Sequence, residues 1–165
     1  MKPALLVVDV QKKFFEIKPT MTQSLNDAIR IINMAIKVFR EKDLPIICIQ
    51  HMSEEMNLMP GEDGFELPVE LNILPSDLHI HKTYGNSFNK TSLEEKLRGL
   101  GIDTIIVTGF AAEACVLATY RGALDHDLTP IILRGSLASD NLENIRFVES
   151  ISNIISMGAL RKVLG

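Results

Sequence analysis

Short apolar runs alternate along the chain with segments that carry apolar residues at helical spacing. The apolar runs predict strands at residues 4–10, 45–50, 78–81, 104–108 and 130–133, with a final edge strand at 160–164. The helical spacing predicts helices at residues 23–41, 93–100, 113–124 and 142–157. Strands and helices therefore alternate along almost the whole chain, which is typical of βαβ units.

Strands that are apolar on both sides and separated by helices predict a parallel sheet covered on both faces. With right-handed crossovers, we expect a doubly wound α/β fold of about six strands in the order 3-2-1-4-5-6. The length of 165 residues fits one domain, spanning 1–165. In this order the sheet reverses between the first and the fourth strand, and ligands of such sheets bind beyond the carboxyl ends of the strands at that reversal.

The longest irregular segment runs over residues 52–75 and is rich in Met, Pro and Gly. A loop of this length inside a compact domain is commonly functional. We interpret it as a lid over the site, and the alternative is an ordinary insertion.

Composition excludes several function classes. The net charge is −4, the chain has no Trp, and aromatic residues make up 5% of it, so neither a basic surface nor stacking platforms for nucleic acid are expected. No stretch approaches the ~20 apolar residues of a membrane span, and the apolar start of the chain is too short for a signal peptide. The Gly99-Leu100-Gly101 sequence precedes a strand, the reverse of a dinucleotide-binding fingerprint. We therefore expect a cytoplasmic protein that binds neither nucleic acid nor membranes.

The chain has two cysteines, Cys48 and Cys115, too few for a disulfide scaffold. Cys48 lies inside a predicted strand and is expected in the core. Cys115 begins the helix after the fourth strand and Asp9 ends the first strand, so the two residues flank the predicted reversal of the sheet. The N–H groups and dipole of the helix favour a thiolate at Cys115, which makes it a candidate nucleophile. The alternative is a buried structural cysteine.

Asp9 and Lys82 are the charged candidates beside Cys115. Partial burial of Asp9 after an apolar strand is expected to raise its pKa, so that it could take the thiol proton and later give it to a leaving amine. Lys82 follows the third strand, where its charge would stabilise both the thiolate and the carboxylate. The alternatives are a cap or salt bridge for Asp9 and a solvated surface side chain for Lys82.

Three segments resemble motifs of the isochorismatase-like cysteine hydrolases. The six residues from Asp9 read D-V-Q-K-K-F, similar to the D-x-Q-x-x-F opening of that family. The seven residues from Lys82 read K-T-Y-G-N-S-F, similar to the K-x-x-(Y)-S-A-F segment. The eight residues from Gly109 read G-F-A-A-E-A-C-V, and with Thr119 they are similar to G-x-x-T-x-x-C-V-x-x-T. The three motifs occur in the family order and span most of the chain.

This resemblance implies a catalytic triad of Asp9, Lys82 and Cys115. It also implies a cis peptide between Phe110 and Ala111, which in the family turns the N–H groups matching Ala111 and Cys115 toward the oxyanion. The implied reaction is thiolate attack on an amide-like carbon, release of an amine or ammonia, and hydrolysis of the acyl-enzyme. Homo-oligomers are common in the family, so we expect one here. The candidate substrate contacts are Gln11, Phe14, His51 and Phe88.

A metal ion or other cofactor is not expected. Nicotinamidases of the family carry a D-x-H metal motif after the second strand, and the matching residues here are His51-Met52-Ser53, without an acidic ligand. Zinc sites need about three protein ligands. The function expected is therefore cysteine-dependent cleavage of a C–N bond in a small amide, ureido or carbamoyl compound. The alternatives are isochorismate hydrolysis, or a non-catalytic or redox-responsive protein on the same fold.

Overall fold

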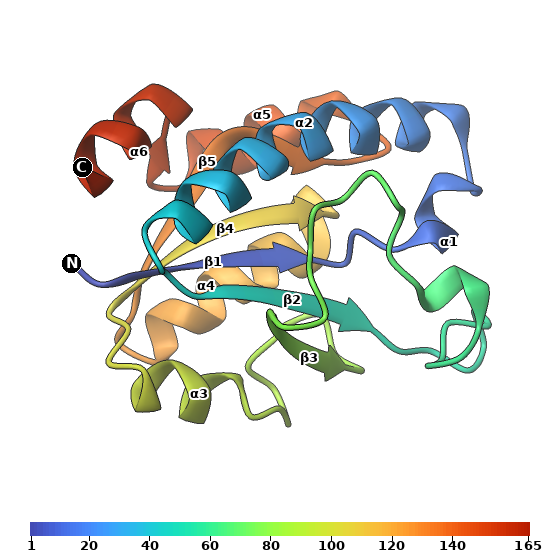
Figure 1. Cartoon of the computed structure of the whole chain (residues 1–165). Coiled ribbons are helices and arrows are strands. Elements are labelled where there is room, and N and C mark those ends of the chain that lie inside the picture. The colour runs from blue at the N-terminus through green and yellow to red at the C-terminus, as the bar shows by residue number, and fades with distance from the viewer.

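A parallel sheet of six strands forms the centre of the molecule (Figure 1). The computed structural model describes residues 1–165. The strand order is β3-β2-β1-β4-β5-β6, and every neighbouring pair is parallel, so the predicted fold and strand order are confirmed. The strands are β1 (Pro3–Val8), β2 (Ile46–His51), β3 (Leu78–Lys82), β4 (Thr104–Phe110), β5 (Thr129–Ala138) and β6 (Ile154–Ile155).

Helices cover both faces of the sheet. Side chains of α2 and α6 pack on one face, and side chains of α3, α4 and α5 pack on the other. A four-residue helix, α1, follows the carboxyl end of β1 (Figure 1). The helical elements are α1 (Lys12–Phe15), α2 (Pro19–Glu41), the 3-10 turn η1 (Asp63–Phe65), α3 (Leu93–Gly99), the π-helical turn η2 (Ala112–Val116), α4 (Leu117–Asp125), α5 (Leu142–Ser150) and α6 (Met157–Leu164).

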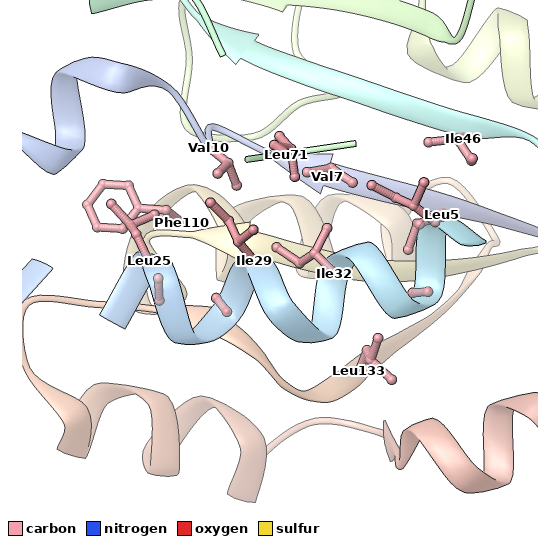
Figure 2. Close-up of a cluster of buried hydrophobic side chains, with 14 of the residues drawn as sticks. Leu5, Val7, Val10, Leu25, Ile29, Ile32, Ile46, Leu71, Phe110 and Leu133 are labelled. Carbon is pink, nitrogen blue, oxygen red and sulfur yellow. The ribbon is translucent and has the colours of Figure 1, made fainter. Parts of the chain in front are cut away.

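The core has two halves because the side chains of β1 alternate between the faces of the sheet. Leu5 and Val7 face α2, where Figure 2 shows them with Ile32 in one cluster. Leu6 and Val8 belong to the cluster on the opposite face. All six residues of β1 are buried, which explains the continuous apolar run of the sequence. Burial of each such side chain contributes about 1.5–3 kcal/mol, so the central strand is held firmly from both sides.

The end of the chain differs from its prediction. Residues 160–164 are not an edge strand, because they form the second half of α6. The sixth strand is the short pair Ile154–Ile155, which lies inside the stretch predicted as helix. The Ser156 side chain accepts a hydrogen bond from the Ala159 N–H at 3.2 Å and caps α6. This cap, followed by good helix-forming residues, decides in favour of the helix.

Residues 52–75 are packed against the core. Leu58, Phe65 and Leu71 are buried in the same cluster as α2. Gln50 and Gln11 both donate hydrogen bonds to the Phe65 carbonyl, each at 3.1 Å. The segment therefore forms a wall near the carboxyl ends of β1 and β2, and its action as a lid stays a prediction.

None of the helices is both long and apolar enough to cross a lipid bilayer.

Gly109 allows β4 to approach β1 very closely. It has φ +113, and a Cβ atom at this position would lie 2.1 Å from the Val8 carbonyl oxygen. Asp9 follows Val8 directly, and the chain after Gly109 leads to Cys115. The absence of a side chain at Gly109 therefore sets how closely the two candidate catalytic segments approach each other.

We expect Gly109→Ala to lower the free energy of unfolding by about 3 kcal/mol or more, because the clash is with backbone and the φ value is unfavourable. Urea denaturation measures the change. Gly158→Ala is the matched control, since Gly158 lies in α6 with nothing within 4 Å of an added Cβ, and it should stabilise by about 0.5–1 kcal/mol. Equal stability of the two variants would contradict the close approach.

Candidate active site

Asp9 is buried just beyond the carboxyl end of β1. Its side chain is 2% exposed, and its backbone has φ 52, a left-handed conformation tolerated by aspartate. Its N–H donates to the Ile49 carbonyl at 2.9 Å, which holds this turn to the neighbouring strand. Burial raises the pKa of the Asp9 carboxyl, and the adjacent Lys82 charge lowers it by a smaller amount. The predicted increase in pKa is therefore confirmed in direction.

Lys82, the last residue of β3, reaches Asp9 across the end of β2. Its Nζ donates to Asp9 Oδ2 at 2.8 Å, and the Lys82 side chain is fully buried. The same ammonium lies 3.0 Å from Nδ1 of His51. Lys82 is thus an internal ion-pair partner of Asp9, and the alternative of a solvated surface lysine is wrong.

His51 ends β2, and its backbone is held by the side-chain amide of Gln11. The Gln11 Oε1 atom accepts from the His51 N–H at 2.8 Å, and its Nε2 donates to the His51 carbonyl at 3.0 Å. Burial first, and then the Lys82 charge, lower the pKa of the His51 imidazole. A neutral ring can accept the Lys82 hydrogen bond at Nδ1, so His51 is fixed beside the ion pair.

Cys115 is partly buried and lies in the π-helical turn η2, which precedes α4. A π turn at this place is a typical local distortion at functional sites. Burial raises the pKa of the Cys115 thiol to about 12, with a further increase from the Asp9 charge and an opposing effect of Lys82. Desolvation and the nearby Asp9 carboxylate therefore oppose the thiolate that the helix terminus was predicted to favour.

The link between β4 and Cys115 has the predicted backbone conformation. The peptide between Phe110 and Ala111 is cis, as the resemblance implied. The Ala111 N–H makes no hydrogen bond inside the chain, while the Ala111 carbonyl accepts from the Val116 N–H at 3.1 Å. Ala111 thus offers one free N–H donor four residues before Cys115, and such a donor is the chemical requirement for stabilising an oxyanion.

The four residues predicted to contact substrate lie in different settings. His51 is partly exposed beside the ion pair. Phe14 is buried, with its ring 4.8 Å from that of Phe110. Phe88 is buried on the opposite face of the sheet and stacks on His126. Gln11 is fully buried and donates to the His51 and Phe65 carbonyls, so its amide hydrogens are already used inside the protein.

The structure brings Asp9, His51 and Cys115 together. One ligand atom of each residue lies within 4.8 Å of the others. The metal ligands considered in the sequence lay along one strand end, whereas these three residues belong to the carboxyl ends of three different strands, Asp9 after β1, His51 at the end of β2 and Cys115 in η2 after β4. The strand order, in which β1 lies between β2 and β4, was the signal that could have predicted this grouping. By contrast, His79 and His81 on β3 are not joined by a third ligand.

A family model of the isochorismatase domain matches residues 3–151 of this chain. The uncharacterised isochorismatase family protein YrdC of Bacillus subtilis is 34% identical over 122 residues, covering 73% of this chain and 65% of YrdC. Ureidoacrylate amidohydrolase RutB of Caulobacter vibrioides is 36% identical over 64 residues, or 39% of this chain and 28% of RutB. Streptothricin hydrolase of Streptomyces noursei is 30% identical over 125 residues, or 73% of this chain and 48% of that protein. The chain thus spans less than two thirds of the length of each of these relatives.

Solved structures share the whole fold. An isochorismatase-like hydrolase from Alkaliphilus metalliredigens superposes with a TM-score of 0.89 at 22% identity, covering 100% of both chains. An N-carbamoylsarcosine amidase from Thermoplasma acidophilum gives a TM-score of 0.80 at 24% identity, covering 95% of this chain and 97% of that one. At these identities the likeness establishes the fold alone. The domain match carries the assignment further: the chain belongs to the isochorismatase family and is a hydrolase.

Proposed function

We propose that this hydrolase cleaves a C–N bond of a small amide, ureido or carbamoyl compound through a thioester at Cys115. The observation that carries the proposal is the buried Asp9 carboxylate, which Lys82 holds at 2.8 Å and which lies beside the Cys115 sulfur. The name of the relative RutB, a ureidoacrylate amidohydrolase, supports hydrolysis of this kind, and the streptothricin hydrolase supports hydrolysis in general.

In the first half of the reaction, Asp9 takes the Cys115 thiol proton as the sulfur attacks the substrate carbon. The Ala111 N–H donates to the oxygen that becomes negative. Asp9 then gives the proton to the nitrogen, the C–N bond breaks, and the amine or ammonia leaves. A carboxyl with a raised pKa suits both steps, because it binds a proton readily and can release it to an amine.

In the second half, water attacks the thioester carbon and Asp9 takes a proton from that water. The C–S bond breaks, the sulfur regains a proton from Asp9, and the acid is released. The Lys82 side chain offsets the negative charge that accumulates on Asp9 and on the sulfur. His51, as the acceptor at 3.0 Å, helps to keep the ammonium in place.

The first test is a screen of small amides, ureido acids and carbamoyl compounds, read by release of ammonia or amine, with isochorismate included. On the best C–N substrate, Cys115→Ala should lower kcat by at least about 10³-fold, because no other group can form the thioester. Intact-mass analysis of the quenched reaction should show the acyl group on Cys115. Cys48→Ala is the control and should keep its activity, since Cys48 is a buried residue of β2. Full activity of Cys115→Ala would disprove the proposal.

The second test concerns the charge of Asp9. In Asp9→Asn the pKa of the Cys115 thiol should fall from about 12 by about 1–3 units, because a charge that raises it is removed while Lys82 remains. The pH dependence of iodoacetamide labelling at Cys115, followed by peptide mass, measures this pKa. The same variant should lose hydrolysis, since it has no base. A thiol pKa that does not change would mean that the Asp9 charge does not act on Cys115. That result would contradict the role of Asp9 as the base.

The third test is the acid side of the pH–rate profile. Asp9 works as a base only when ionised, and burial raises its pKa, so activity should be lost as the pH falls through that raised value. The acid limb of kcat/KM should therefore lie above the ordinary aspartate range of about 3.9. His51→Gln assigns the limb, because the imidazole also titrates in acid. Disappearance of the limb in His51→Gln would assign it to His51 and not to Asp9.

A further inference from the structure

We propose that Asp9, His51 and Cys115 form a binding site for a divalent transition-metal ion such as Zn²⁺. The ion would inhibit the enzyme, and this consequence, unlike the binding itself, rests on the proposed function. The site differs from the D-x-H metal motif, because two of its three ligands are the proposed nucleophile and base. A metal would therefore act here as a competitor of the chemistry and not as its cofactor.

The three side chains already meet the main geometric requirement. Their ligand atoms lie within 4.8 Å of one another. In a tetrahedral zinc site with bonds of about 2.0–2.3 Å, ligand atoms lie about 3.3–3.8 Å apart, so the side chains must converge by only about 1 Å. His51 and Cys115 are partly exposed, so solvent reaches both ligands. Water would supply the fourth ligand.

An unpartnered oxygen points independently to a ligand at this place. Asp9 Oδ1 is buried and has no hydrogen-bond partner, whereas Oδ2 is bound by Lys82. The Cys115 thiol interacts with the Asp9 carboxyl. Oδ1 nevertheless accepts no hydrogen bond from any group of the chain. Buried carboxylate oxygens are almost always satisfied, and this one can coordinate a metal without displacing Lys82 from Oδ2.

The ligand set suits a borderline-soft ion. A thiolate, an imidazole and a carboxylate are all ligands of Zn²⁺ and Co²⁺, whereas Mg²⁺ and Ca²⁺ prefer oxygen. Binding forms a metal–sulfur bond and breaks the S–H bond of Cys115, and the proton passes to the buffer. The product has the sulfur lone pair and the carboxylate engaged, so neither can act on a substrate.

The Lys82 ammonium, 2.8 Å from Asp9 and 3.0 Å from His51, is the charge that opposes the ion. Its repulsion should make the affinity weaker than that of a structural zinc site. Lys82→Met removes the charge and should tighten metal binding, whereas loss of a ligand should weaken it. This opposite response of two adjacent variants is specific to an ion seated in this cluster.

The test is titration of the full chain with Co²⁺, followed by the thiolate-to-cobalt charge-transfer band, and displacement of the cobalt by Zn²⁺. Cys115→Ala should abolish the band, and His51→Gln should weaken binding by at least about tenfold. Zn²⁺ should also protect Cys115 from iodoacetamide. His79→Gln and Cys48→Ala are matched controls and should bind Co²⁺ like the parent chain, because neither residue belongs to the cluster.

Equal weakening by His51→Gln and His79→Gln, or a band that persists in Cys115→Ala, would overturn the site, and neither result depends on Lys82→Met folding. Activity separates the two proposals. Cys115-dependent turnover that saturating Zn²⁺ does not reduce would overturn the inhibition and leave the proposed function intact. Metal binding as expected, without any Cys115-dependent turnover, would support the site and overturn the proposed function.

Discussion

The site depends on one buried ion pair, Lys82 to Asp9. Both side chains are almost completely removed from water, and their charged atoms are 2.8 Å apart. Desolvation of two charges costs several kcal/mol, and the attraction between them often does no more than offset it. Such a pair is weak evidence for stability, and here Oδ1 of the carboxylate is left unsatisfied as well. A group kept ionisable at such a cost is more readily explained by chemistry than by folding.

The backbone determines how closely Asp9 approaches Cys115 and His51. Asp9 takes a left-handed conformation that turns it out of β1, and Gly109 lets β4 approach without a side chain between them. Gln11 then fixes the end of β2 through both backbone groups of His51. Few residues therefore contact the reacting atoms. Gln11, through its buried side-chain amide, and Gly109 position those few residues.

The sequence was sufficient for the sheet order and for the placement of Asp9 and Cys115 at its reversal, because apolar periodicity and chain direction determine both. It was not sufficient for the end of the chain, where Ile154–Ile155 and α6 are short and a single Ser156 cap decides between strand and helix. It also missed contacts that only the sheet order creates. The contact of His51 with Lys82 joins two strand ends 31 residues apart in the chain. In the sequence motifs, His51 and Lys82 belong to separate segments.

The largest difference between the prediction from sequence and the structure concerns the protonation of Cys115. Position at a helix terminus suggested a thiolate, but burial and the Asp9 charge raise the thiol pKa to about 12, so the resting sulfur is protonated. A protonated, partly buried thiol is a poor redox sensor, since oxidation proceeds through the thiolate. This argues against the redox-responsive alternative and makes the proton the barrier to reaction. Asp9 must remove it as the substrate binds, and a metal ion must displace it to bind. The sulfur is therefore reactive only when Asp9 has taken its proton, or toward a metal ion that takes the place of that proton, and not in the resting enzyme.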